Sequence, residues 1–140
     1  MLFIIADPRP SGFLIDAETF VLEARNKWPE ESLEVIQSSD SLMSDVSIYI
    51  DLKNEPPFSI IHFYSNDLIT CDGNLDNSIE VALRLRNLLS KETVMWLTDG
   101  HFGFHIALYP GMEKKDIMNN WVDHAEHDPY EEYPEYFGSD

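Results

Sequence analysis

Residues 93–109 restrict the possible fold more than any other segment, because their pattern is that of a β-hairpin. Apolar and polar side chains alternate on both sides of Asp99-Gly100, a dipeptide suited to a two-residue type I′ turn. With that turn, Met95 is expected opposite Phe104 and Trp96 opposite Gly103. The hairpin therefore predicts an antiparallel sheet with one buried face. That core face is expected to consist of Met95, Leu97, Phe102, Phe104 and Ile106, and the other face of Val94, Trp96, Thr98, His101, Gly103 and His105.

Other segments are also expected to form strands. In the clearest of them Val46, Ile48 and Ile50 alternate with polar residues, which is the period of a half-buried strand. Ser65-Asn66 is the expected turn between the last two strands before the second helix, although it lacks a glycine. The expected strands are residues 2–6, 33–37, 46–52, 58–64 and 67–71.

Three helices are expected between and after these strands. Asp16 can cap the first, and Pro29 stops it. The second is expected to begin near Asp76 or Asn77, with Glu80 as the capping-box partner of Asn77. Apolar residues recur every three or four positions in each helix. The expected stripe of the first helix is Ala17, Phe20, Val21, Ala24 and Trp28. That of the second is Ile79, Ala82, Leu83 and Leu89, with Arg84 and Arg86 toward the other side of the helix. That of the third is Ile117, Met118, Trp121, Val122 and Ala125.

The order of these elements is strand, helix, antiparallel strands, helix, hairpin and helix. It predicts a single α+β domain in which about three helices pack on an antiparallel β-sheet. We expect the domain to span residues 1–125. Residues 126–140 are expected to form an acidic, tyrosine-rich C-terminal segment attached to it.

That C-terminal region has an unusual composition. Residues 123–140 contain seven carboxylates, three tyrosines and a phenylalanine, with no lysine or arginine. Aromatic rings supply contact area, and carboxylates supply steering and charge-assisted hydrogen bonds. The segment therefore predicts a surface that binds a basic partner. The acids are Asp123, Glu126, Asp128, Glu131, Glu132, Glu135 and Asp140, and the tyrosines are Tyr130, Tyr133 and Tyr136.

Charge over the whole chain narrows the class of partner. Nine basic residues stand against 26 acidic residues, a formal net charge of −17. This disfavours direct binding to nucleic acids or to anionic membranes, both of which require a basic footprint.

No apolar run approaches the roughly 18 residues of a membrane span, and the N-terminal apolar run lacks a basic leader. The single Cys71 allows no internal disulfide and fits a reducing compartment. We expect a cytoplasmic protein.

Histidines provide the only candidates for a metal site. Four strand residues separate His101 from His105 by about 13 Å, too far for one ion. His124 and His127 would suit a shared ion on a helix, with acids adjacent, but a solvated last helical turn explains them as well. A third ligand is not identified, so no metal site and no cofactor is predicted. Cys71 is expected to be a buried structural residue, because acidic neighbours do not activate a thiol.

Trp96 and His101 share the second face of the predicted hairpin. They are expected either to form a second core layer beneath a helix or to belong to a partner-binding patch anchored by an exposed tryptophan. The alternatives remain open at this level. Residues that would contact a partner are Trp96, His101, Asp128, Tyr130, Glu131, Glu132, Tyr133, Glu135 and Tyr136.

The acidic, aromatic C-terminal segment and the hairpin at residues 96–105 together resemble the immunity proteins of bacterial toxin systems, in particular those of contact-dependent growth inhibition. The resemblance implies a cytoplasmic antitoxin without enzymatic activity. Such a protein binds a cognate basic toxin domain, often a nuclease, and blocks its active site or an adjacent exosite. Two alternatives stand beside it. One is a metal-dependent enzyme or small-molecule binder that uses His124 and His127, and the other is a general protein-interaction module.

Overall fold

The computed structural model describes residues 3–6, 15–37, 44–64, 68–91, 95–99, 104–120 and 122–123. Eight β-strands and three α-helices lie in this part of the chain. The strands are β1 (Phe3–Ala6), β2 (Leu33–Gln37), β3 (Ser44–Ile50), β4 (Phe58–Phe63), β5 (Leu68–Cys71), β6 (Met95–Asp99), β7 (Phe104–Leu108) and β8 (Val122–Asp123). The helices are α1 (Ala17–Lys27), α2 (Leu75–Arg86) and α3 (Lys114–Asn119), and a short 3-10 helix, η1, spans Glu30–Ser32.

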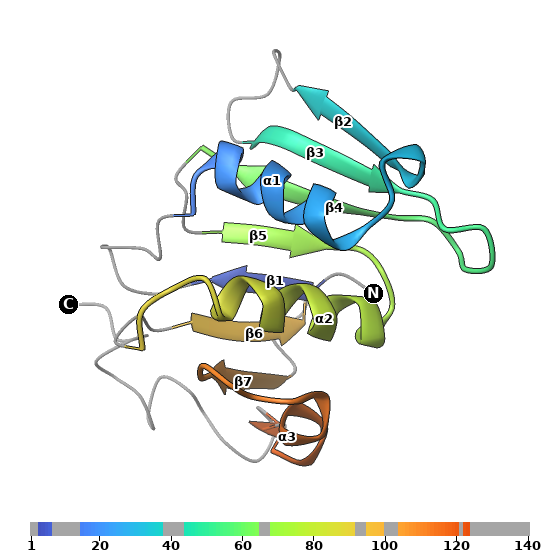
Figure 1. Ribbon diagram of the computed structural model, residues 1–140. Coiled ribbons are helices and arrows are strands. Elements are labelled where there is room, and N and C mark those ends of the chain that lie inside the picture. The colour runs from blue at the N-terminus through green and yellow to red at the C-terminus, as the bar shows by residue number, and fades with distance from the viewer. Residues whose placement is uncertain are drawn as a thin grey trace.

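All eight strands form one sheet in the order β2-β3-β4-β5-β1-β6-β7-β8. Every neighbouring pair is antiparallel. Strand β1 lies in the middle, between β5 and β6, and α1 carries the chain from there to the edge strand β2 (Figure 1). Strands β2 to β5 then return toward β1 as a meander. The N-terminal strand thus joins two antiparallel halves into one sheet.

Helices α1 and α2 lie side by side across the same face of the sheet, and α3 lies near its β7 end (Figure 1). The core fills the space between these helices and the sheet. Val46, Ile48 and Ile50 project into it from β3, while Tyr49 on the same strand is exposed. The expected α+β fold, with helices on one antiparallel sheet, is confirmed.

Helix α1 forms where its sequence pattern predicts it. Asp16 is extended, and its carboxylate accepts a hydrogen bond from the Thr19 backbone N–H at 2.8 Å. Phe20 and Ala24 are buried, and the helix ends at Lys27, just before Trp28 and Pro29. An aspartate cap, an apolar stripe and a terminating proline therefore define this helix as expected.

Helix α2 begins earlier than predicted. Asn74, not Asp76 or Asn77, is its N-cap, and the Asn74 side chain accepts a hydrogen bond from the Asn77 N–H at 2.8 Å. Asparagine caps a helix about as well as aspartate, so the local sequence offered several equivalent starts. The expected outward position of Arg86 is also wrong, because this side chain is buried.

The β6–β7 hairpin has a different register from the predicted one. Met95 stands opposite Leu108 instead of Phe104, and Trp96 opposite Ala107 instead of Gly103. The physical reason lies on the other side of β6, where Asp99 pairs with Phe3 of β1 and so belongs to the ladder instead of a two-residue turn. The shift is of four residues, an even number, so Met95, Leu97 and Ile106 still share one face, as expected.

Helix α3 is shorter than predicted. It ends at Asn119, and Val122–Asp123 forms strand β8, which pairs with β7 through His105↔Val122 and Phe104↔Asp123. Pairing at the sheet edge replaces the expected continuation of the helix to Ala125. The turn predicted at Ser65-Asn66 and the segment at residues 126–140 lie outside the described residues.

Candidate partner-binding surface

Most of the residues predicted to contact a partner lie outside the described residues, and their positions stay predictions. His124 and His127, the alternative metal pair, lie outside them too, and α3 ends before it reaches them. The predicted contact residues concerned are His101, Asp128, Tyr130, Glu131, Glu132, Tyr133, Glu135 and Tyr136.

Trp96 is described, and the expectation of an exposed anchor is wrong for it. Only 4% of its surface is exposed, and its ring centroid lies 5.2 Å from that of His105, which is also buried. Strand β6 runs between β1 and β7, and all five of its residues are buried on both faces of the sheet. Trp96 is therefore buried in the interior.

His62 is a buried polar residue with two hydrogen-bond partners, and the sequence did not single it out. Its Nδ1 lies 2.6 Å from Asp45 Oδ1, and its Nε2 lies 2.5 Å from the backbone carbonyl oxygen of Ile15. The ring is fully buried and lies 5.4 Å from the Phe20 ring, centroid to centroid. Each ring nitrogen lies within hydrogen-bond distance of an oxygen atom, and the ring is fully buried, so a substrate cannot reach it. The ring joins β4, β3 and the start of α1.

Cys71 is buried at the end of β5, as expected of a structural residue. Burial raises the pKa of its thiol. Nucleophilic attack requires a thiolate that a substrate can reach, and a buried neutral thiol provides neither.

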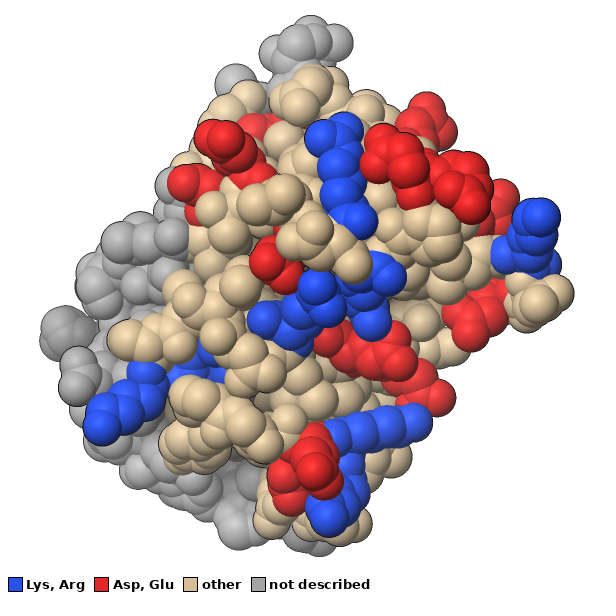
Figure 2. Space-filling model, viewed as in Figure 1, with Lys and Arg blue, Asp and Glu red and all other residues tan. Residues whose placement is uncertain are grey.

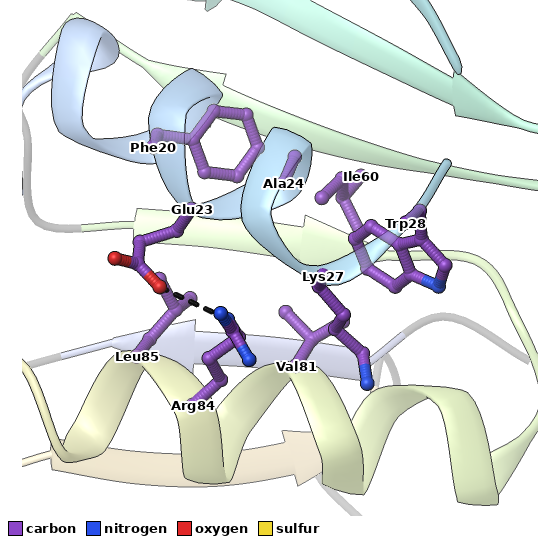
Figure 3. A pocket seen from close by; sticks show the side chains of 9 residues that line it. All are labelled: Phe20, Glu23, Ala24, Lys27, Trp28, Ile60, Val81, Arg84 and Leu85. Atoms are coloured by element: carbon purple, nitrogen blue, oxygen red, sulfur yellow. Dashed lines mark hydrogen bonds and ion pairs between the residues drawn. The ribbon is translucent and has the colours of Figure 1, made fainter. Parts of the chain in front are cut away.

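A shallow groove between α1 and α2 has the appearance of a ligand site (Figure 3). Its cavity volume is about 20 Å³, enough for roughly one water molecule. Arg84 Nε lies 2.9 Å from Glu23 Oε2 across it, and Lys27 Nζ lies 3.1 Å from Glu80 Oε2 and 5.3 Å from the centre of the Trp28 ring. Both cations are thus neutralised by glutamates. The groove is a packing seam between two helices.

Arg86 contributes to the core and not to a site. Its Nε donates to the Leu108 carbonyl and its Nη2 to the Ser90 carbonyl, both at 3.0 Å. Burial lowers the pKa of this guanidinium. The side chain ties the end of α2 to strand β7 and to the chain that follows the helix.

The other basic side chains are mostly engaged by acids. Figure 2 shows that on the helix-covered face most Lys and Arg side chains lie among Asp and Glu. The ion pairs of the described residues are Arg25–Glu30, Lys27–Glu80, Arg84–Glu23, Lys114–Asp76 and Lys115–Glu113. Because acids outnumber bases by 26 to nine, this pairing leaves a surplus of carboxylates.

The surplus is conspicuous around edge strand β2. Exposed acids lie in η1 just before the strand, on the strand itself, and just after β3. The end of β3 lies next to η1, because the Asp51 N–H donates a hydrogen bond of 2.9 Å to the Ser32 carbonyl. Within the described residues Glu31, Glu34 and Asp51 enter none of the ion pairs. The acids at this end of the sheet are Glu30, Glu31, Glu34, Asp51 and Glu55, against Arg25 and Lys53.

A larger hollow, about 470 Å³, lies between α1 and the other end of β2, where Gln37 pairs with Val46, and Glu18 and Arg25 also line it. Val21 and Leu22 of α1 and Val46 of β3 give it apolar walls, and Leu22 is 56% exposed. On the other face of β2, Ile36 is 45% exposed. Apolar contact area beside surplus carboxylate is the composition expected of a surface that binds a basic protein. We call α1, η1 and β2 with this hollow the β2 surface.

Sequence reasoning missed the β2 surface, because residues 33–37 read simply as a strand. One signal was available. Ile36 stands between Val35 and Gln37 on the polar side of the Leu33–Val35 alternation, where an apolar residue is out of pattern.

Comparison with protein-family models, with curated proteins and with solved structures finds no match to this chain. Across the described ranges, no group of three or more His, Cys, Asp and Glu side chains is arranged to hold a metal ion. In the same ranges no helix has the length and apolar character needed to cross a bilayer.

Proposed function

We propose that this chain is an immunity protein that binds and neutralises a basic toxin domain. The observation that carries the proposal is the charge pairing: five Lys and Arg side chains are held by acids of the same chain, and the surplus carboxylates remain exposed beside an open sheet edge. A surface of this kind favours a basic partner and repels anions.

The surplus charge extends beyond the β2 surface. Residues 124–140 carry six acids and no Lys or Arg, and the preceding 123 residues carry 20 acids against nine bases. Both parts are therefore acidic. In the proposal Asp128, Glu131, Glu132 and Glu135 supply charge at the C-terminal segment, and Tyr130, Tyr133 and Tyr136 supply contact area.

A nuclease toxin suits this chemistry, because its active site must be basic to hold phosphates. An acidic protein can occupy that site or a neighbouring exosite and exclude the substrate. Long-range attraction would make association fast and sensitive to salt. Neutralisation of a toxin inside the producing cell also implies a cytoplasmic location.

The test uses the product of the gene adjacent to the one that encodes this chain. Its C-terminal domain is expressed in a host cell with and without this chain, and survival is measured. We expect survival only with coexpression, together with a stoichiometric complex of the two purified proteins. If the neighbouring product is not toxic, or if no complex forms at low salt, the proposal is wrong.

A further inference from the structure

Strand β2 has a free side in the part of the chain that the structure describes. It is first in the strand order and pairs only with β3 (Figure 1). The pairing Leu33↔Ile50 continues to Ser32 and Asp51, where the Asp51 N–H donates to the Ser32 carbonyl. Backbone groups in an antiparallel ladder alternate in direction from one residue to the next. Glu34 and Ile36 therefore direct their N–H and C=O groups toward β3.

The alternate residues of β2 direct their backbone N–H and C=O groups away from β3. These are Leu33, Val35 and Gln37. The Leu33 N–H already donates to the Glu30 carbonyl of η1, so the edge offers the Leu33 carbonyl and both backbone groups of Val35 and Gln37. A row of this kind is what an additional strand requires for antiparallel or parallel pairing.

Side chains on the two faces of β2 define what such a strand must carry. On the helix side, Gln37 and Val46 lie in the hollow whose walls include Val21 and Leu22 of α1. On the other side, Glu34 and Ile36 are exposed. Successive residues of an added strand would point alternately to these two sides. The hollow fits apolar side chains, and the Glu34 side fits basic ones.

We infer that the β2 edge receives an extended basic segment of the partner, which joins the sheet through backbone hydrogen bonds to Val35 and Gln37. The basic character of this segment rests on the proposed function and on the acids that surround the edge. Glu31 and Glu34 lie before and on β2 and enter none of the ion pairs of the described residues.

A second copy of this chain is a poorer occupant of the same edge. Antiparallel pairing of β2 with another β2 about Val35 would place Glu34 of the two copies diagonally across the strands, with a formal net charge of −17 on each chain. Like charges across neighbouring strands are destabilising. The charge at the edge thus selects a basic strand over self-association.

Amide hydrogen exchange of the full chain tests this inference. The probe is a short synthetic peptide of alternating lysine and valine, and the control peptide has glutamate in place of each lysine. At a free peptide concentration of about ten times its Kd, exchange at the Val35 and Gln37 amides should slow about tenfold, because exchange then requires release of the peptide. Glu34 and Ile36, already directed to β3, should change little.

Two variants at one position separate backbone pairing from general attraction. Gln37→Pro removes an outward N–H without removing a bond to β3, whereas Gln37→Ala keeps that N–H. We expect weaker peptide binding for Gln37→Pro than for Gln37→Ala. Glu34→Lys, which leaves the backbone intact, should also weaken binding of the lysine peptide, and it keeps the test decisive if the proline variant does not fold.

Three results would overturn the inference: no slowing at Val35 and Gln37, equal slowing with the glutamate peptide, or slowing that grows with protein concentration alone. The last would identify a second copy as the occupant. Toxin neutralisation is read separately. If neutralisation occurs without protection of these amides, the proposed function stands and the edge inference fails. If the amides are protected but no toxin is neutralised, the edge inference stands and the proposed function fails.

Discussion

The imidazole of His62 and the carboxylate of Asp45 lie 2.6 Å apart, Nδ1 to Oδ1, and join strand β4 to the beginning of β3. The other ring nitrogen donates to the carbonyl of Ile15, just before α1. A single buried ring thus fixes where α1 begins relative to the sheet. The edge strand β2 follows α1 in the chain, so the β2 surface depends on this contact.

Replacing His62 with leucine should destabilise the fold. The ring is fully buried, and the Ile15 carbonyl and the Asp45 carboxylate would each lose a hydrogen-bond partner. We expect a loss of about 2–3 kcal/mol in the free energy of unfolding, measured by urea denaturation.

Two control variants test whether the loss of stability is specific to the His62 ring. Asp45→Asn should cost less, because the Asp45 side chain is 18% exposed and water can reach it. Tyr109→Ala, at an exposed residue, should change the free energy of unfolding by less than about 0.5 kcal/mol. A His62→Leu effect no larger than that of Tyr109→Ala would show that the ring does not hold the strands together.

Asp16 should make stability depend on pH. The hydrogen bond from the Thr19 backbone N–H lowers the pKa of the Asp16 carboxyl below its ordinary value of 3.8. Because the pKa is lower in the folded protein than in the unfolded chain, the stabilisation is complete above the unfolded value and is lost as pH falls through the folded value.

Asp16→Asn keeps an oxygen acceptor at the helix N-cap but does not titrate. The wild-type protein should therefore be more stable than this variant at neutral pH, and the gap should close in acid. Asp16→Ala should be the less stable of the two variants, since it also loses the acceptor. A gap between wild type and Asp16→Asn that is the same at all pH values would contradict this account.

Arg84 and Arg86 are two residues apart on α2 and should differ sharply in their effect on stability. Arg86→Met removes the donors for the buried Leu108 carbonyl and for the part-buried hydrogen bond to the Ser90 carbonyl, and we expect a loss of about 2–4 kcal/mol in thermal or urea unfolding. Arg84→Met removes a partly exposed ion pair with Glu23 (Figure 3) and should cost at most about 1 kcal/mol. Equal costs would mean that Arg86 is not part of the core.

The elements of the fold could be predicted wherever local chemistry determines them. In the sequence Asp16 and Pro29 mark the start and the end of α1, and in the structure the helix begins and ends close to these residues. The alternation of Val46, Ile48 and Ile50 likewise gave both the strand and its buried face. In these segments capping, periodicity and termination all agree.

Features that depend on distant partners could not be predicted. The hairpin register was wrong because a shift of four residues keeps Met95, Leu97 and Ile106 on one face in both registers, and only the pairing of Asp99 with Phe3 distinguishes the two registers. Burial of Arg86 depends on the Leu108 carbonyl, 22 residues away, which no helical pattern reveals.

Of the candidate site, the sequence could predict only an acidic character. The net charge of −17 favours a basic partner, which stays a prediction. The β2 surface was missed because it arises from strand order: β1 enters the middle of the sheet, and β2 is thereby left at the edge. Neither the position of an edge nor the pairing of Lys and Arg with particular acids can be read from composition.

The central claim is that carboxylates attract a basic toxin domain. Its most direct test is the association rate constant with the proposed toxin domain, taken from the product of the adjacent gene, measured by stopped flow at low and high salt. For the wild type we expect a decrease of about tenfold or more as salt is raised. The variant Glu131→Lys/Glu132→Lys should associate about tenfold more slowly than the wild type at low salt.

A charge-matched control, Asp76→Lys/Glu80→Lys on α2, should slow association less, since each of these acids already pairs with a lysine. A rate constant at low salt that is unchanged by reversal at Glu131 and Glu132 would contradict the role of the C-terminal segment. A wild-type rate constant that does not respond to salt would contradict the central claim itself.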